Sequence, residues 1–185
     1  MNSVLHNIKL VIFDLDGTLV KSNTSEIPYF FEQLSVLSAM EVDSDISQYP
    51  QRTFCSVLNS IHTPNNIEAL YNELDCKMLG FAKDTVWCPL QLGESLLELV
   101  KKQGIDYYIV TGNFKKASIQ KASLAGIAID SDKLYSTDLC SDSKLEIIKN
   151  LIADRNLCSD EVLSIGDSQY DKDIADQLGL KFLLV

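Results

Sequence analysis

The sequence has no long apolar run, which argues against a membrane-spanning helix. No stretch among its 185 residues approaches the roughly 20 consecutive apolar residues that a bilayer requires. Residues 1–10 are too polar and too short for a secretory signal. We therefore expect a cytoplasmic protein with no membrane partner.

The cysteines form no recognisable pattern. The five cysteines are scattered, odd in number and form no CxxC pair. This pattern argues against a disulfide framework and against a thiolate zinc site. We expect buried or idle thiols in a reducing compartment.

Basic residues are also scarce. Sixteen lysines and arginines face 26 acidic residues, for a net charge of −10. Such a surface repels nucleic acid, so we expect no nucleic-acid partner. It would also repel a phosphorylated substrate, so any anion site must be made locally by a metal, a lysine or helix N-termini.

Three common catalytic signatures are missing. The sequence contains no GxxxxGK[ST] loop, no GxSxG and no HExxH. Nucleotide-kinase, serine-hydrolase and zinc-protease interpretations therefore lack their first requirement.

Strands and helices alternate through much of the chain, whose 46% hydrophobic and 23% charged residues are ordinary for a globular domain. Expected strands are Ile8–Phe13, Asp106–Val110, Leu134–Tyr135, Val162–Ile165 and Phe182–Val185. Helices are expected over 92–103 and 115–124, followed by one that holds Leu145, Ile148, Leu151 and Ile152 on one face and a last one that carries Ile174, Ala175 and Leu178. This alternation predicts right-handed βαβ units in a doubly wound α/β fold with a parallel sheet of about five strands.

Residues 22–84 have a different pattern. Apolar residues recur at helical spacing in three segments, with no strand between them: Ile27–Leu37, Phe54–Ile61 and Ile67–Met78. Three amphipathic helices in a row indicate a small bundle. We therefore expect a core domain of residues 1–21 and 85–185, with residues 22–84 inserted after the first strand as a helical domain.

Two carboxylates follow the first expected strand one residue apart. Because alternate side chains of a strand share a face, Asp14 and Asp16 can face one space. At the carboxyl end of a buried parallel strand, that space is where open α/β sheets bind ligands. The two carboxylates repel each other, so a cation or a proton must relieve the conflict. The alternative is a plain Asp-Gly turn without chemistry.

Three further strand ends lead into polar or small residues. They are Thr111-Gly112, the loop before Lys144, and Gly166-Asp167 with Asp171. In a parallel sheet these ends share one edge, so the groups should converge on the first two aspartates. Asp167 and Asp171 could aim at one point from a helix start and suit Mg²⁺, or they are simply acids favoured by the helix dipole.

Lys144 lies where a lysine is normally disfavoured. Ser143 and Glu146 fit a capping box, which makes Lys144 the first residue of a helix. The helix dipole opposes a cation there, which suggests a separate reason for it. The alternative is a solvated surface lysine.

Together these segments resemble the four motifs of the haloacid dehalogenase (HAD) superfamily. The matching residues are Asp14-Leu15-Asp16-Gly17-Thr18, Thr111-Gly112, Lys144 and Gly166–Asp171, in the family's order. The resemblance covers Ile8 to Val185, and the insertion is similar to the small helical cap of the phosphoglycolate phosphatase-like branch. Leu145 stands where the family usually has a proline.

The resemblance implies a Mg²⁺-dependent phosphatase for a small phosphorylated metabolite, with an aspartyl-phosphate intermediate. Asp14 would attack phosphorus, and Asp16 would protonate the leaving alcohol and then activate water. The implied metal ligands are Asp14, the backbone carbonyl of Asp16, and Asp167, with Asp171 in support. Thr111 and the Gly112 N–H would bind the phosphoryl oxygens, and Lys144 would neutralise their charge.

Recognition of the leaving group is expected in the insertion. Arg52 is its single arginine and could capture a carboxylate or a second phosphate bidentately. The alternative is a solvent-exposed surface arginine. Gly112 and Asn113 complete the expected substrate-binding set.

Other functions remain open. A phosphomutase or phosphonatase of the same superfamily is expected to bring a His or Lys from the insertion, whose one histidine, His62, we expect to be structural. A dehalogenase is disfavoured because Asp16 is present. A non-catalytic binding protein on this scaffold would be expected to lack a motif residue, and none is missing.

Overall fold

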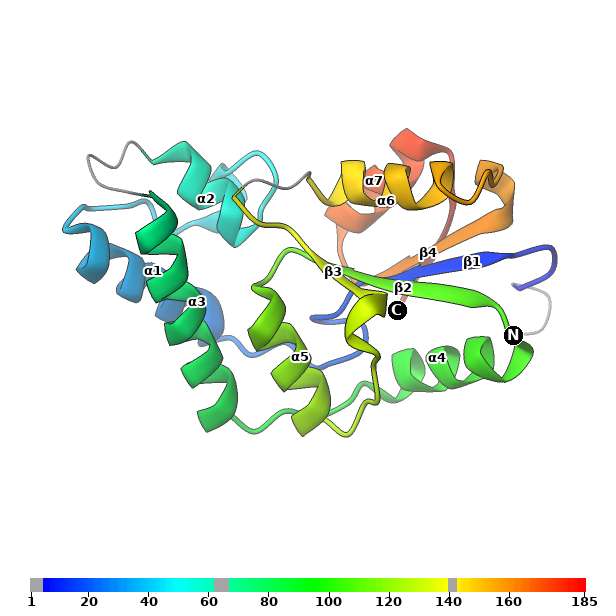
Figure 1. Cartoon of the computed structure of the whole chain (residues 1–185), viewed down its shortest axis with the longest axis horizontal. Helices are drawn as coiled ribbons and strands as arrows, with labels where there is room; N and C mark the ends of the chain where they lie inside the picture. Colours follow the sequence, from blue (N-terminus) through cyan, green and yellow to red (C-terminus); the bar gives the residue numbers. More distant parts are fainter. Residues whose placement is uncertain (1–4, 62–66, 140–142) are drawn as a thin grey trace.

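The computed structural model describes residues 5–61, 67–139 and 143–185. At its centre is a five-stranded parallel sheet with the order β3-β2-β1-β4-β5 (Figure 1). The strands are β1 Leu10–Phe13, β2 Asp106–Thr111, β3 Leu134–Ser136, β4 Val162–Gly166 and β5 Lys181–Leu184. The predicted parallel α/β sheet is therefore confirmed. β1 begins two residues later than predicted, because the Ile8 N–H donates to the Leu5 carbonyl in a preceding turn.

Two helices cover each face of the sheet. Helices α4 (Gln91–Gln103) and α5 (Lys115–Leu124) pack on one face, and α6 (Lys144–Ala153) and α7 (Gln169–Leu178) pack on the other (Figure 1). In β1, Val11 and Phe13 point to the first layer, whereas Leu10 and Ile12 point to the second. A strand buried on both faces needs a continuous apolar run, which is what the sequence has here.

The helical insertion lies between β1 and α4 in the chain. It contains three helices, α1 (Glu26–Ser38), α2 (Phe54–Ser60) and α3 (Ile67–Asp84), and a 3₁₀ turn at Ile46–Gln48. Two further 3₁₀ turns, Ser131–Lys133 and Ser159–Glu161, lie in the rest of the described chain. The three helices share a hydrophobic cluster that also takes in Phe114 and Ala117 at the start of α5. Phe30 stacks on Phe54 with 4.2 Å between the ring centroids. The insertion is thus anchored on one core helix, and its exact division from the core at residues 22 and 84 stays a prediction.

The chain enters and leaves the insertion through two adjacent segments. The Lys21 N–H donates to the Cys88 carbonyl at 2.9 Å, and the Leu90 N–H donates to the Leu19 carbonyl at 2.8 Å. These bonds fix both connections beside the loop that follows β1.

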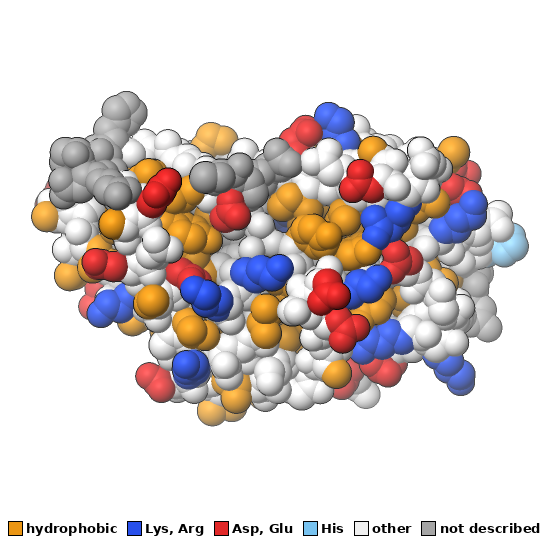
Figure 2. Space-filling model, in the orientation of Figure 1, with side chains coloured by type: hydrophobic (Ala, Val, Ile, Leu, Met, Phe, Trp, Pro, Cys, Tyr) orange, Lys and Arg blue, Asp and Glu red, His pale blue; other side chains and the backbone are white. Residues whose placement is uncertain are grey.

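The surface agrees with the mixed composition. In Figure 2, acidic and basic side chains are interspersed on the visible face.

The cysteines that the structure describes are unpaired. Cys55 is a buried free thiol, and Cys76, Cys88 and Cys158 are exposed free thiols. No helix in the described part of the chain is long and apolar enough to cross a membrane. His62 and Cys140 lie outside the described residues.

Candidate active site

One cavity of about 300 Å³ lies at the carboxyl edge of the sheet. All nine residues that the sequence analysis assigned to a site line it: Asp14, Asp16, Arg52, Thr111, Gly112, Asn113, Lys144, Asp167 and Asp171. Parallel pairing explains this convergence. Asp14 follows β1 directly and its N–H donates to the Ile165 carbonyl of β4 at 2.9 Å, while Thr111 is the last residue of β2.

Three carboxylates meet on one side of the cavity. Asp14, Asp167 and Asp171 each offer an oxygen within 4.8 Å of the others. Two glycines permit this approach. A Cβ added at Gly17, whose φ is +84°, would lie 2.0 Å from Asp167 Oδ2, and one at Gly166 would lie 2.5 Å from the Asp171 Cβ. Three converging carboxylate oxygens form a donor set that suits a hard divalent cation such as Mg²⁺.

Lys144 lies between two of these carboxylates. Its Nζ is 2.6 Å from Asp14 Oδ1 and 2.6 Å from Asp171 Oδ1, with 7% of the side chain exposed. Ser143 caps α6 by accepting from the Glu146 N–H, so Lys144 is the first helical residue, as predicted. Burial alone would lower the pKa of Lys144, but the two carboxylates outweigh burial and raise it. The lysine is therefore a fixed positive charge.

Asp171 serves both the helix and the site. Its Oδ2 accepts from the Ser168 hydroxyl at 2.6 Å and from the Ser168 N–H at 3.3 Å, which completes a capping box at the start of α7. Its Oδ1 accepts from Lys144. The helix begins at Gln169, so Asp167 lies in the loop before it and is exposed, rather than in the first turn. The role of Asp171 as a first-turn acid of α7 is therefore confirmed, and its part in metal binding stays a prediction.

Burial strongly affects Asp14. It raises the pKa of Asp14 to about 7, against the opposing effect of the Lys144 charge and with added repulsion from Asp171. Burial and repulsion from Asp171 also raise the pKa of Asp167. Without a cation, Asp14 therefore keeps its proton at a pH where an ordinary aspartate has lost it.

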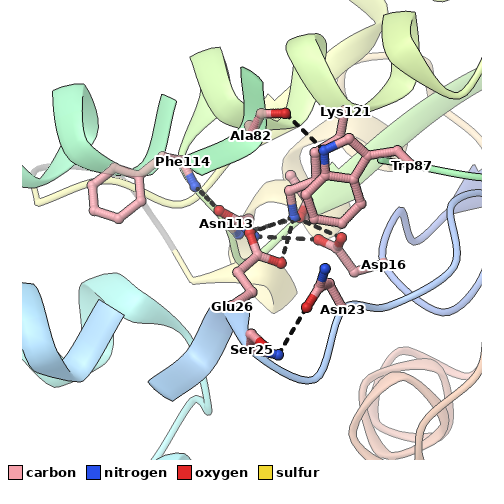
Figure 3. A network of polar contacts seen from close by, with 10 residues as sticks. Asp16, Asn23, Ser25, Glu26, Ala82, Trp87, Asn113, Phe114 and Lys121 are labelled. Atoms are coloured by element: carbon pink, nitrogen blue, oxygen red, sulfur yellow. Dashed lines mark hydrogen bonds and ion pairs between the residues drawn. The ribbon is translucent and has the colours of Figure 1, made fainter. Parts of the chain in front are cut away.

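The Asp16 carboxylate belongs to a second network, which the sequence analysis missed (Figure 3). Its Oδ1 is 2.7 Å from Lys121 Nζ, and the same ammonium is 2.7 Å from Glu26 Oε1. Asn113 Nδ2 donates to Glu26 at 2.8 Å and to Asp16 Oδ2 at 3.4 Å. The Asn113 Oδ1 accepts from the Phe114 N–H. The polar atoms of Asn113 are thus used inside the protein, and its contact with substrate stays a prediction.

The insertion closes the cavity on the far side. A Cβ added at Gly112 would lie 2.6 Å from the Thr53 Cγ2, so the start of α2 packs directly on this glycine. The neighbouring Arg52 is exposed, has a left-handed φ of +49°, and lines the cavity. Its charge also acts on the Tyr170 hydroxyl of α7, where it opposes the burial that raises the pKa of Tyr170. Arg52 therefore lines the cavity from the side of the insertion.

The sequence matches the haloacid dehalogenase-like hydrolase family over residues 11–185, and the chain belongs to this family. No curated protein sequence matches it. The same fold occurs in solved structures of other proteins.

One similar structure is CbbY from Rhodobacter sphaeroides in complex with phosphate, with a TM-score of 0.74 and 14% identity over 96% of this chain and 85% of that chain. A second is a hydrolase from Pseudomonas syringae, with a TM-score of 0.73 and 18% identity over 95% and 84%. A third is a predicted phosphoglycolate phosphatase from Haemophilus somnus, with a TM-score of 0.65 and 18% identity over 96% and 85%. At these identities the likeness establishes the fold.

Proposed function

We propose that the protein is a Mg²⁺-dependent phosphomonoesterase that transfers the phosphoryl group of a small phosphorylated metabolite to Asp14 and then to water. The observation that carries this proposal is the meeting of Asp14, Asp167 and Asp171 within 4.8 Å beside a buried lysine. It combines a nucleophile, a set of oxygen donors and a fixed cation in one cavity. Phosphoryl transfer requires these elements to be held in position.

The donor chemistry fits a divalent cation. Five carboxyl groups line the cavity, those of Asp14, Asp16, Glu26, Asp167 and Asp171. In the described part of the chain, Lys121 and Lys144 are the buried cations beside them. Asp14, Asp167 and the backbone carbonyl of Asp16 would hold Mg²⁺, with Asp171 in support. Bound Mg²⁺ would supply positive charge that offsets the surplus of carboxylates and of phosphoryl oxygens.

The remaining residues have distinct tasks in this proposal. An Asp14 oxygen attacks phosphorus, and the bond from phosphorus to the ester oxygen breaks. Thr111 and the Gly112 N–H donate to the phosphoryl oxygens, and Lys144 balances their charge. Asp16 gives a proton to the departing ester oxygen and takes one from the water that later hydrolyses the Asp14 phosphate.

Two similar structures support a small phosphorylated substrate. CbbY from Rhodobacter sphaeroides was crystallised with phosphate and, as a mutant, with xylulose-(1,5)bisphosphate. The cavity wall contributed by the insertion here combines apolar Ile27, Ile46 and Phe54 with polar Asn23. Such a wall suits a compact leaving group with both polar and apolar parts.

The experiment that tests the proposal is phosphate release from a broad panel of phosphorylated metabolites and from 4-nitrophenyl phosphate, each with Mg²⁺ and with excess chelator. We expect release that depends on Mg²⁺ for at least one member of the panel. Full activity in chelator would contradict the proposed mechanism.

Mg²⁺ should raise the melting temperature, because it binds the folded carboxylate cluster and not the unfolded chain. The size of the rise should depend on pH. Burial raises the pKa of Asp14 from 3.8 to about 7 in the metal-free protein. Between these values the folded state keeps a proton that the unfolded chain has lost, so this group's contribution to the free energy of unfolding falls as pH rises. Mg²⁺ must displace that proton, so its effect should be larger at about pH 8 than at about pH 5.5.

The Mg²⁺-induced rise in the melting temperature of Asp167→Ala tests whether the cation binds at the carboxylate cluster. This variant should show a much smaller Mg²⁺-induced shift than the wild type. The control is Asp160→Ala, which removes an exposed acid from the 3₁₀ turn Ser159–Glu161, at the opposite end of β4 from Asp167, and should keep the full shift. Identical shifts in the wild type and Asp167→Ala would place the metal elsewhere.

Arg52→Ala should distinguish leaving-group recognition from phosphoryl chemistry. If Arg52 binds an acidic leaving group, the variant raises KM for the acidic natural substrate by about tenfold or more, since one charge-assisted hydrogen bond is worth about 1.5–3 kcal/mol. Hydrolysis of 4-nitrophenyl phosphate should change little. Lys77→Ala is the matched control, because it removes an exposed cation from α3 of the same insertion. An equal effect on both substrates, or none, would return Arg52 to the role of a surface residue.

A further inference from the structure

We propose that Lys121, Glu26 and Asn113 are positioning residues for Asp16. They hold its carboxylate so that it can transfer a proton to and from the reacting oxygen. This inference rests on the proposed function and extends it to a lysine and a glutamate outside all four motifs.

The Asp16 carboxylate is held at both oxygens. Lys121 donates to Oδ1 at 2.7 Å and Asn113 donates to Oδ2 at 3.4 Å. The side chain is still 24% exposed and lines the cavity. Because each oxygen accepts a hydrogen bond from a buried side chain, the Asp16 carboxylate has little rotational freedom. Its exposed side faces the cavity. Geometry of this kind is needed for proton transfer, because the group must lie within hydrogen-bond reach of the atom that it serves.

Lys121 is a fully buried cation that pairs with a partly exposed acid, Asp16. Its side chain is 0% exposed, and its ammonium lies 4.9 Å from the centre of the Trp87 ring (Figure 3). A buried cation is costly unless it is paired and hydrogen-bonded. Glu26 supplies a second carboxylate partner at 2.7 Å. Lys121 therefore keeps an anionic partner in place whether or not Asp16 carries its proton.

A purely structural role explains these contacts less well. Buried ion pairs often stabilise a fold no more than well-packed apolar residues of the same volume. Lys121, Glu26 and Asn113 are buried, whereas the Asp16 side chain is partly exposed and lines the cavity. The feature that apolar packing could not replace is the orientation of the Asp16 carboxylate.

The network also joins the insertion to the reacting group. Glu26 lies in the first turn of α1, and Trp87 lies in the segment that returns from α3. The Trp87 indole N–H donates to the Ala82 carbonyl of α3 at 2.8 Å. Both connections of the insertion therefore touch the lysine that holds Asp16. The orientation of Asp16 should depend on how the insertion is seated.

The test compares kcat/KM for phenyl phosphate and 4-nitrophenyl phosphate. The phenolate is the poorer leaving group and needs the proton from Asp16 more. For Lys121→Met we expect kcat/KM to fall by about 10- to 100-fold on phenyl phosphate, and by only about threefold on 4-nitrophenyl phosphate. Lys115→Met is the matched control, because it removes an exposed lysine from the same helix, and it should leave both values unchanged.

A double-mutant cycle separates positioning from general damage. If Lys121 acts through Asp16, adding Lys121→Met to Asp16→Asn should cost little beyond Asp16→Asn alone. Additive losses, or equal losses on both substrates, would overturn the inference. Glu26→Gln is a nearly isosteric second variant that should show the same pattern more weakly, and it serves if Lys121→Met fails to fold.

Failure of the proposed function has a different signature. It would appear in the wild type as the absence of Mg²⁺-dependent phosphate release. Crystal structures of the wild type and Lys121→Met then decide the inference without turnover. We expect the Asp16 carboxylate to turn away from its wild-type position in the variant, and an unmoved carboxylate would overturn the inference.

Discussion

Asp14→Asn should abolish phosphate release, with kcat/KM falling by about 10⁴-fold or more, because a neutral amide cannot replace the attacking carboxylate. The substitution keeps the size of the side chain, so the cavity keeps its shape. It also removes one of the two carboxylates that are 2.6 Å from Lys144. The measurement is phosphate release from 4-nitrophenyl phosphate at saturating Mg²⁺.

Asp173→Asn is the matched control for Asp14→Asn. Asp173 is an exposed aspartate of α7 that accepts from the Gln169 side chain and does not line the cavity. The turnover of Asp173→Asn should equal that of the wild type. Near-normal turnover by Asp14→Asn would remove the nucleophile from the proposed mechanism.

Lys144→Met should destabilise the metal-free protein by about 3 kcal/mol or more. The variant leaves Asp14 and Asp171 buried and close together without the cation that now lies 2.6 Å from each. Turnover should also fall, since the phosphoryl oxygens lose a fixed positive charge. Urea unfolding without Mg²⁺ measures the loss of stability.

Lys149→Met is the control on the same helix. Its lysine pairs with Glu146 at the surface, with 59% of the side chain exposed, so its free energy of unfolding should change by less than about 0.5 kcal/mol. Mg²⁺ should recover part of the loss in Lys144→Met, because it also relieves the repulsion between carboxylates. Equal unfolding curves for the two variants would show that Lys144 does not neutralise the cluster.

The sequence predicted the sheet well because a strand buried on both faces has a recognisable pattern. The continuous apolar run from Leu10 to Phe13 is typical of a strand in the middle of a parallel sheet, where both faces are covered by helices. The prediction for the start of α7 is less accurate. Asp167 and Asp171 together suggest a helix that begins at the first of them. In the structure Ser168 is the N-cap, its side chain accepts from the Asp171 N–H, and the helix begins at Gln169.

The site could be predicted where it follows strand ends and could not where it depends on packing. Asp14, Thr111 and Asp167 lie next to strands, so a parallel sheet brings them to one edge. Lys121 and Glu26 are 95 residues apart, and a lysine within a helix normally faces solvent. A weak signal existed, because Lys121 follows Ala117 by four residues on the buried side of α5. The burial of Lys121 depends on Glu26 and Trp87, which come from distant parts of the chain, and no local pattern in the sequence indicates those contacts.

The most direct test of the proposed chemistry is to trap the phosphorylated protein. The protein is mixed with 4-nitrophenyl phosphate and Mg²⁺, quenched in acid within one turnover, digested, and examined by mass spectrometry. We expect a phosphoryl group on the peptide that contains Asp14, lost in excess chelator and absent from Asp14→Asn. Phosphate release with no phosphorylated Asp14 peptide at any quench time, or phosphorylation of another residue, would contradict the mechanism.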